Sequence, residues 1–367
     1  MAITRFFILL FSLVCILFFG GFRYSLQIDA PMVLRDSKLN FTPSEFYISD
    51  VEDERDDRRS VAVLLEKQGT QPTVARPVDL KGGAAIALKS FIYRNLYRDT
   101  SLRTVIVTIK EFKLTESILP NGRVSGHLAV VFSFALLFSD RTVHLVDYSG
   151  GLRYNRPDNQ PVDAETILRQ GIEQALSYFN KWINNQAESN ALLAKSVKVR
   201  FTDYSESPEG DTIYYSVSRP LTWADFKDKP RVSRFEAEVF TSIGYTEQNE
   251  VIKGIIYVNM AIKVNVAKSD CFVKEGSHDG YILNHEQRHF DIEKLVSEHF
   301  KQKIFAMDLP VDNFYGFINV EYLETLREAT RMQKLYDNET RHGQDRSEQE
   351  RWNKKIDKEL ESYGFKK

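Results

Sequence analysis

Between residues 44 and 188, stretches of alternating apolar and polar positions are interrupted by two segments with helical spacing. Residues 80–97 and 163–184 repeat apolar side chains every three or four positions, which predicts two helices. The alternating stretches predict β-strands at 46–51, 61–66, 103–114, 123–138 and 142–148. This order predicts an α+β domain with one antiparallel sheet and helices on one of its faces.

The second half of the chain changes from strand patterns to helix patterns. Residues 184–196 are polar and rich in alanine and indicate a hinge, so we expect a second domain at 197–367. Strands are predicted at 197–202, 213–217, 235–245 and 255–266, and helices at 279–307, at 320–335 and after Ser347. Strands that precede helices indicate a sheet that backs the helix at 279–307.

Two further segments give expectations about surfaces. Residues 53–59 alternate acidic and basic side chains, which favours a solvated hairpin loop between the first two strands. The strand predicted at 255–266 is rich in valine and isoleucine, and as a sheet edge it could pair with an extended peptide.

The amino-terminal segment indicates export. Residues 6–21 are sixteen positions without a charge, longer than a minimal signal-peptide core but shorter than the roughly 20 residues that span a bilayer comfortably. Residues 1–30 are therefore either a signal peptide or a membrane anchor. We expect a periplasmic protein, or one anchored on the periplasmic side, that contacts the membrane only through this segment.

Charge and cysteine content narrow the class of protein. The 49 basic and 51 acidic residues are interspersed and give a formal net charge of −2, which does not favour binding to nucleic acid or to an anionic membrane surface. Beyond the leader Cys271 is the one cysteine, so the mature chain has no intramolecular disulfide.

The most specific motif is HExxH at residues 285–289. His285 and His289 are four residues apart on the predicted helix, so both imidazoles can bind one Zn²⁺. Glu286 lies beside them and could take a proton from a metal-activated water. Glu293 lies about 12 Å along the helix from His285, too far to share the ion with both histidines.

Three segments resemble a bacterial family of unknown biology described as predicted secreted zinc-dependent proteases. They are 219–226 (RPLTWADF), 283–292 (LNHEQRHFDI) and 336–343 (YDNETRHG), the last followed by Gln349 and Trp352. The likeness spans residues 200–363 and implies a zincin-like metallopeptidase domain. By pattern alone, residues 44–188 resemble small periplasmic lipoprotein and transport-auxiliary domains of Gram-negative bacteria, which implies an accessory domain that could bind an envelope protein.

The sequence offers two candidates for the third metal ligand. Glutamates at 321, 324 and 328 on the next predicted helix would make a His₂Glu site, whereas His342 would make a His₃ site. We favour His342 for two reasons. It belongs to the matching segment, and a structural role does not readily account for a His-Gly pair at a helix junction. Tyr336 could stabilise an oxyanion, or it could be a buried tyrosine that caps the helix.

These observations predict a zinc metallopeptidase of the cell envelope. Its substrate is a peptide or protein, with His285, His289 and His342 as metal ligands and Glu286 as general base. The alternative is a non-catalytic envelope protein with a structural metal or none, in which the first domain binds a partner. An enzyme needs an open coordination position, whereas a fourth protein ligand would close the site.

Overall fold

The computed structural model describes residues 30–67, 72–138, 140–230, 233 and 235–365. The expected leader at 1–30 lies outside the described residues, apart from Ala30. In the described part no helix is both long and apolar enough to cross a bilayer. The chain divides into two compact units, with the change from the first to the second at Tyr178–Phe179 and with Phe138 and Asp140 grouped with the second unit.

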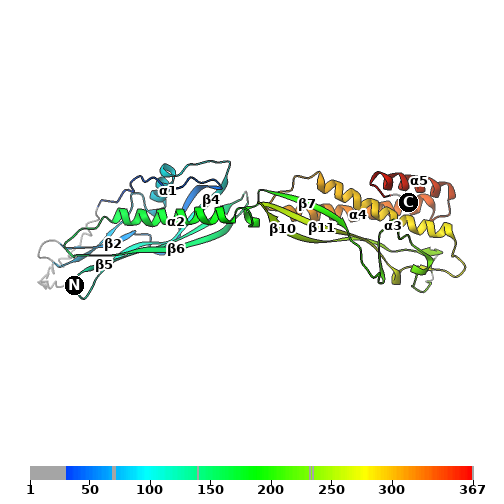
Figure 1. Ribbon diagram of the computed structural model, residues 1–367, viewed down its shortest axis with the longest axis horizontal. Helices are drawn as coiled ribbons and strands as arrows, with labels where there is room; N and C mark the ends of the chain where they lie inside the picture. Colours follow the sequence, from blue (N-terminus) through cyan, green and yellow to red (C-terminus); the bar gives the residue numbers. More distant parts are fainter. Residues whose placement is uncertain (1–29, 68–71, 139, 231–232, 234, 366–367) are drawn as a thin grey trace, which may run out of the picture. The chain divides into compact units, whose positions relative to one another are not determined.

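The first unit is built on a six-stranded sheet (Figure 1). Its strands are β1 (Phe46–Asp53), β2 (Ala62–Glu66), β3 (Val74–Val78), β4 (Arg103–Ile118), β5 (Val124–Leu137) and β6 (Thr142–Arg156). The order is β3-β2-β4-β5-β6, and β1 also pairs with β4. Both β1 and β2 run parallel to β4, while the other pairs are antiparallel. The sheet is therefore mixed, and the expected all-antiparallel sheet is wrong.

The charged run between β1 and β2 explains this difference. Arg55 is 4% exposed, and its guanidinium binds Asp53 and the backbone carbonyls of Ser60 and Phe112. The run is therefore held against β4 and carries the chain onward along the same strand, instead of reversing it in a solvated hairpin.

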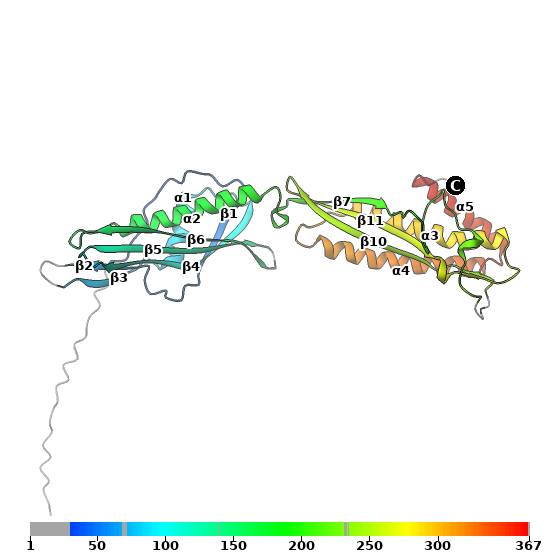
Figure 2. The ribbon, with the colours of Figure 1, turned by 60° about the horizontal axis from the view of Figure 1, so that its bottom comes forward.

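Helices α1 (Ala84–Asn95) and α2 (Ala164–Gln186) cover one face of this sheet (Figures 1 and 2). A Cβ at Gly171 of α2 would meet the side chains of Leu128 and Val130 on β5, so this helix packs closely on the sheet. Helix α1 begins four residues later than the apolar pattern predicts, because Gly82 and Gly83 adopt φ angles of 83° and 84°. The α+β class predicted from the sequence is confirmed.

The second unit contains a four-stranded sheet. Its strands are β7 (Ser196–Asp203), β8 (Thr212–Tyr214), β10 (Thr241–Ile252) and β11 (Ile255–Ala267). Strand β11 pairs with β10 along one edge, and with β7 and then β8 along the other. The expectation that 255–266 forms a sheet edge is therefore wrong. The short strands β9 (Ala237–Glu238) and β12 (Phe272–Val273) form a separate pair.

Three helices follow: α3 (Gly280–Phe305) and α4 (Phe314–Thr340) pack on this sheet, and α5 (Arg346–Ser362) packs on α3 and α4. Phe290 and Phe300 of α3 belong to the core shared with the sheet, whereas Ile292 and Leu295 belong to a second core that includes Trp352 of α5. Helix α3 is thus covered on two sides. A sheet backs the HExxH helix, as the sequence indicates.

Candidate metal centre

The HExxH residues lie in the first three turns of α3. Asp279 caps this helix by accepting from the backbone N–H groups of Tyr281 and Ile282. Their spacing of four residues places His285 and His289 on one side of the helix, with ring centroids 5.0 Å apart. The structure therefore brings the two predicted histidine ligands together.

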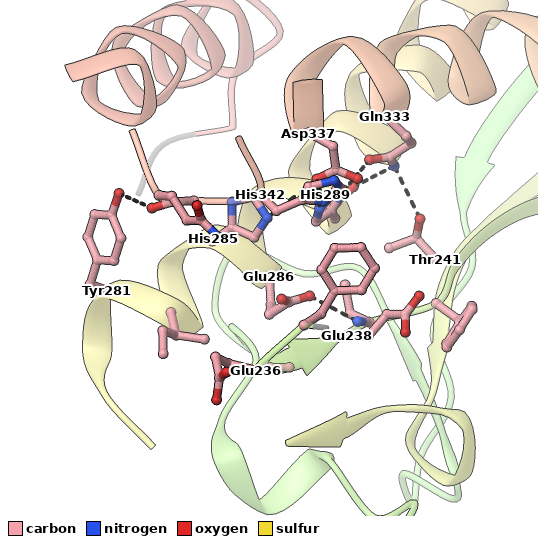
Figure 3. A pocket seen from close by; sticks show the side chains of 17 residues that line it. Glu236, Glu238, Thr241, Tyr281, His285, Glu286, His289, Gln333, Asp337 and His342 are labelled. Carbon is pink, nitrogen blue, oxygen red and sulfur yellow. Dashed lines mark hydrogen bonds and ion pairs between the residues drawn. The ribbon is translucent and has the colours of Figure 1, made fainter. Parts of the chain in front are cut away.

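The third residue of the group is Asp337, on α4. Its Oδ1 atom lies 3.4 Å from Nε2 of His285 and 3.0 Å from Nε2 of His289. Ligand atoms of these three residues all lie within 4.8 Å of one another, and in the described part of the chain they form the one such group. Figure 3 shows Asp337 and Gln333 approaching the histidines from α4.

Gln333 determines which nitrogen of His289 carries hydrogen. Its amide nitrogen donates to the backbone carbonyl of His289 at 2.9 Å and to the carboxylate of Glu293 at 3.0 Å, and both partners are acceptors. The amide oxygen must then be the atom 2.6 Å from Nδ1 of His289, and it accepts a hydrogen bond from that nitrogen. In the neutral imidazole the lone pair of Nε2 therefore faces Asp337.

Gln349 likewise determines which nitrogen of His285 carries hydrogen. Its amide nitrogen donates to Asn353 Oδ1 at 3.0 Å, an oxygen that also accepts from the guanidinium of Arg288. Because arginine can only donate, Asn353 offers an oxygen here, and the amide oxygen of Gln349 must face Nδ1 of His285 at 3.0 Å. The Nε2 lone pair of His285 also points towards Asp337.

These contacts leave one buried acceptor atom without a hydrogen-bond donor. Oδ1 of Asp337 is buried, and no donor reaches it with hydrogen-bonding geometry. Two imidazole lone pairs and a carboxylate oxygen repel one another unless a cation, a proton or a metal ion, lies between them. Two imidazole nitrogens, each orientated by an outer hydrogen bond at Nδ1, and one carboxylate oxygen fit a zinc site.

The pKa values of these groups reflect the same need for a cation. Burial works to lower the pKa of His289, but the neighbouring carboxylate of Asp337 outweighs it and raises that pKa to about 9. Burial works to raise the pKa of Asp337, yet the two histidines hold it below its ordinary value. A proton can therefore occupy the place of a metal ion, and a metal ion would have to displace it.

Glu286 lies on the opposite side of the histidine rings from Asp337 (Figure 3). This residue is 4% exposed, and its Oε2 atom accepts from the backbone N–H of Val239 at 2.9 Å. Burial raises the pKa of Glu286, although both histidines counteract this. A carboxylate held in this way can exchange a proton with a group in the space before it.

That space is a cavity of about 460 Å³. It lies between α3, the end of α4 with the following loop, and the segment from Phe235 to Thr241 (Figure 3). His285, Glu286, His289 and Asp337 all line it. The three possible ligands and the glutamate therefore face one volume that a substrate could enter.

His342 also lines the cavity, on the loop after α4. Its Nδ1 atom lies 3.5 Å from Oδ1 of Asp337, and its ring packs on Phe235 with centroids 4.4 Å apart. It stands next to the group of three residues but is not part of it. The loop passes close to the histidines because Gly343 adopts a φ of 76°, and a Cβ there would lie 3.3 Å from the ring of His285.

The glutamates weighed as alternatives lie elsewhere. Lys303 binds both Glu321 and Glu328, and Arg327 binds Glu324. None of the three glutamates lines the cavity.

Tyr336 does not have the position expected of an oxyanion donor. It is fully buried and is absent from the cavity wall. Its hydroxyl donates to the backbone carbonyl of His285 at 3.3 Å and accepts from Gln349, while its ring stacks on that of His285 at 4.9 Å. Of the two roles weighed for Tyr336, this position favours a buried tyrosine that packs behind the histidines.

The segments that carry the family resemblance meet at this centre. Leu221, in the 219–226 segment, donates its backbone N–H to the side chain of Gln287 at 2.8 Å. Asp337 belongs to the 336–343 segment, so a carboxylate ligand was present in a matched motif that the sequence analysis quoted. Gln333 lies outside that motif, and its position one turn before Asp337 was the available signal.

No family model matches the chain, and no curated protein matches it. Among solved structures, the crystal structure of protein XCC0632 from Xanthomonas campestris, family-model DUF330, has 13% identity and a TM-score of 0.25. That match covers 44% of this chain and 94% of the other. A second structure, of an uncharacterized protein, has 11% identity and a TM-score of 0.21 and covers 41% of this chain and 99% of the other. The protease resemblance therefore rests on the three sequence segments.

Proposed function

We propose that the protein is a zinc-dependent hydrolase that cleaves peptide bonds. His285, His289 and Asp337 would hold the ion, and Glu286 would act as general base. One observation carries the proposal. Two imidazole lone pairs converge on a buried carboxylate oxygen that lacks a donor, at the wall of a cavity that Glu286 also lines.

Each group at the centre would have its own role in the reaction. Bound zinc would supply Lewis acidity and would lower the pKa of a water molecule. Val239 holds Oε2 of Glu286, so Oε1 is the oxygen available to accept the proton of the attacking water. Glu286 then passes this proton to the leaving amine. In the neutral imidazoles, Gln333 and Gln349 place the hydrogen on Nδ1 and leave the Nε2 atoms of the two histidines free to bind a metal ion.

The proposal assigns the third ligand to Asp337 instead of His342. With three protein ligands the fourth position stays open for water, as catalysis requires. If His342 also bound the ion, four protein ligands would close the site, and the protein would be a non-catalytic one with a structural metal. The separation of 3.5 Å between His342 and Asp337 makes this the competing proposal.

Export to the periplasm and an envelope partner for residues 44–188 are also proposals, and they come from the sequence. Membrane contact would be made only through residues 1–30.

Metal analysis combined with a peptide-cleavage assay tests the proposed function. We expect about one zinc ion per chain, lost in His285→Ala and in His289→Ala because too few donors remain for tight binding. Glu286→Gln should retain zinc and lose hydrolysis, since an amide cannot accept the proton. Metal content that is unchanged in both histidine variants would contradict the site. Wild-type turnover in Glu286→Gln would contradict the general base.

A further inference from the structure

Among the residues that the structure describes, the charged groups on the cavity wall are not balanced. Of the 17 described residues that line it, none is lysine or arginine, while four carry carboxylates. These are Glu236, Glu238, Glu286 and Asp337. A cavity with this composition has a negative potential that favours a cationic ligand.

Three of the four carboxylates have partners. Glu236 accepts from the hydroxyl of Ser277 at 2.6 Å and lies 3.5 Å from Nζ of Lys274. Glu286 accepts from the backbone of Val239, and Asp337 lies against the histidines. With zinc bound, the two charges of the ion would offset Glu286 and Asp337, and Lys274 offsets Glu236. One carboxylate is left without a counter-charge.

That carboxylate belongs to Glu238. This residue lies on β9, where its backbone pairs with Phe272 of β12, and its side chain is partly buried. Within the residues that the structure describes, its carboxylate has neither a hydrogen bond nor an ion pair. A partly buried carboxylate without a cation is unfavourable, so a ligand that supplies the cation would gain binding energy here.

The rest of the wall suits the stem of a long basic side chain. Phe235, Phe240 and Ile282 line the same cavity and offer apolar surface. Lysine and arginine bury their methylene groups against such surface while the charged end reaches a polar group. A carboxylate beside apolar groups therefore selects an amphipathic cation over a small inorganic one.

We infer that the substrate is a peptide with a lysine or arginine close to the bond that is cut, and that Glu238 binds this basic side chain. The inference rests on the proposed hydrolysis. It makes Glu238 a specificity residue and leaves the general-base role with Glu286.

A degenerate peptide library incubated with the zinc-loaded full-length chain tests the inference. Mass spectrometry of the products should show lysine or arginine enriched at one fixed position relative to the cut. Two synthetic peptides that differ only by lysine or norleucine at that position should then differ in kcat/KM by about 10-fold or more, as for a hydrogen bond to a charged group. Glu238→Gln should reduce this ratio below about 3-fold, with most of the loss in the lysine peptide.

The control variant is Glu275→Gln, which removes the same charge from an exposed position on the turn after β12. It should keep the preference for lysine, so that a loss in Glu238→Gln reports the local contact and not net charge. Cleavage without enrichment of basic residues, or an unchanged ratio in Glu238→Gln, would overturn the inference and leave the hydrolase intact. A library left uncut by zinc-loaded wild-type protein would overturn the proposed function and the inference with it.

Discussion

The Nε2 atom of His289 lies 3.0 Å from the Oδ1 atom of Asp337, on an adjacent helix, and no hydrogen bond joins them. Gln333 takes the hydrogen of this imidazole on its other side, at Nδ1. The contact is therefore stable only with a cation between the two atoms. This relationship makes Asp337 the third member of the proposed metal site.

Replacing Asp337 should remove more metal affinity than replacing His342. We expect Asp337→Ala to weaken zinc binding by more than about 100-fold, since a direct ligand exceeds the 10–100-fold effect of outer partners. His342→Ala should fall within or below that outer range. Competition with a chromophoric chelator measures both constants. Equal losses in the two variants would indicate that both residues bind the ion.

Gln333 should affect the affinity for zinc without binding the ion itself. Gln333→Leu removes the acceptor of Nδ1 of His289 and should weaken zinc binding by about 10–100-fold. The matched control is Gln344→Leu, because Gln344 lies on the cavity wall but is exposed. The same chelator titration measures both variants. Wild-type affinity in Gln333→Leu would show that the imidazole does not need this partner.

Gly343 should tolerate alanine poorly. Its φ of 76° costs an L-residue about 1–2 kcal/mol, and the added Cβ would also press on the ring of His285 at 3.3 Å. Gly276 has a φ of 85° with nothing within 4 Å of an added Cβ, so Gly276→Ala incurs the backbone cost alone. Urea denaturation of both variants should show the larger loss for Gly343→Ala, together with weaker zinc binding. Equal stability and unchanged zinc affinity would argue against crowding at His285.

Asp203 should contribute stability that is lost in acid. Lys294, 1% exposed, and Lys301 both bind its carboxylate, at 2.8 Å and 2.7 Å. Burial works to raise the pKa of Asp203, but the two lysines outweigh it and hold the pKa below its ordinary value. Because the folded pKa is the lower one, the contribution is complete above the ordinary pKa of about 3.9 and disappears as pH falls through the folded value.

Asp203→Asn should therefore lower the free energy of unfolding by about 1–3 kcal/mol at neutral pH, because Lys294 loses a partner. The difference from wild type should shrink as the pH falls below the ordinary value. Urea denaturation between pH 3 and 7, with the exposed Asp308→Asn as control, measures it. A pH-independent difference would mean that the charge of Asp203 is not the cause.

Most of what could be predicted follows from the spacing of residues within single helices and strands. The HExxH pair and its helix follow from spacing within one element, and so do most strands of both units. The strand β3 was not predicted. It contains Pro77, which is tolerated because at a sheet edge the missing N–H costs no hydrogen bond. The parallel pairing of β1 and β2 with β4 depends on the buried Arg55, which sequence alone presents as one charge in a solvated run.

The third ligand could not be settled from the sequence because it depends on how α4 packs against α3. Tyr336, Asp337 and His342 are neighbours in one motif, yet one is buried behind the histidines, one faces them, and one stands beside them. Their order along the chain gives no means of choosing among these positions. The glutamine partners of the histidines were hidden for the same reason.

The most direct test of the metal centre is a crystal structure of the zinc-loaded full-length chain, with an anomalous difference map recorded at the zinc edge. The account predicts one strong peak, about 2.0–2.2 Å from Nε2 of His285, Nε2 of His289 and a carboxylate oxygen of Asp337. Glu286 should face its remaining coordination position. A peak that is also ligated by His342, with no position left for water, would contradict the hydrolase. Zinc bound elsewhere, with Asp337 still against protonated histidines, would contradict the site itself.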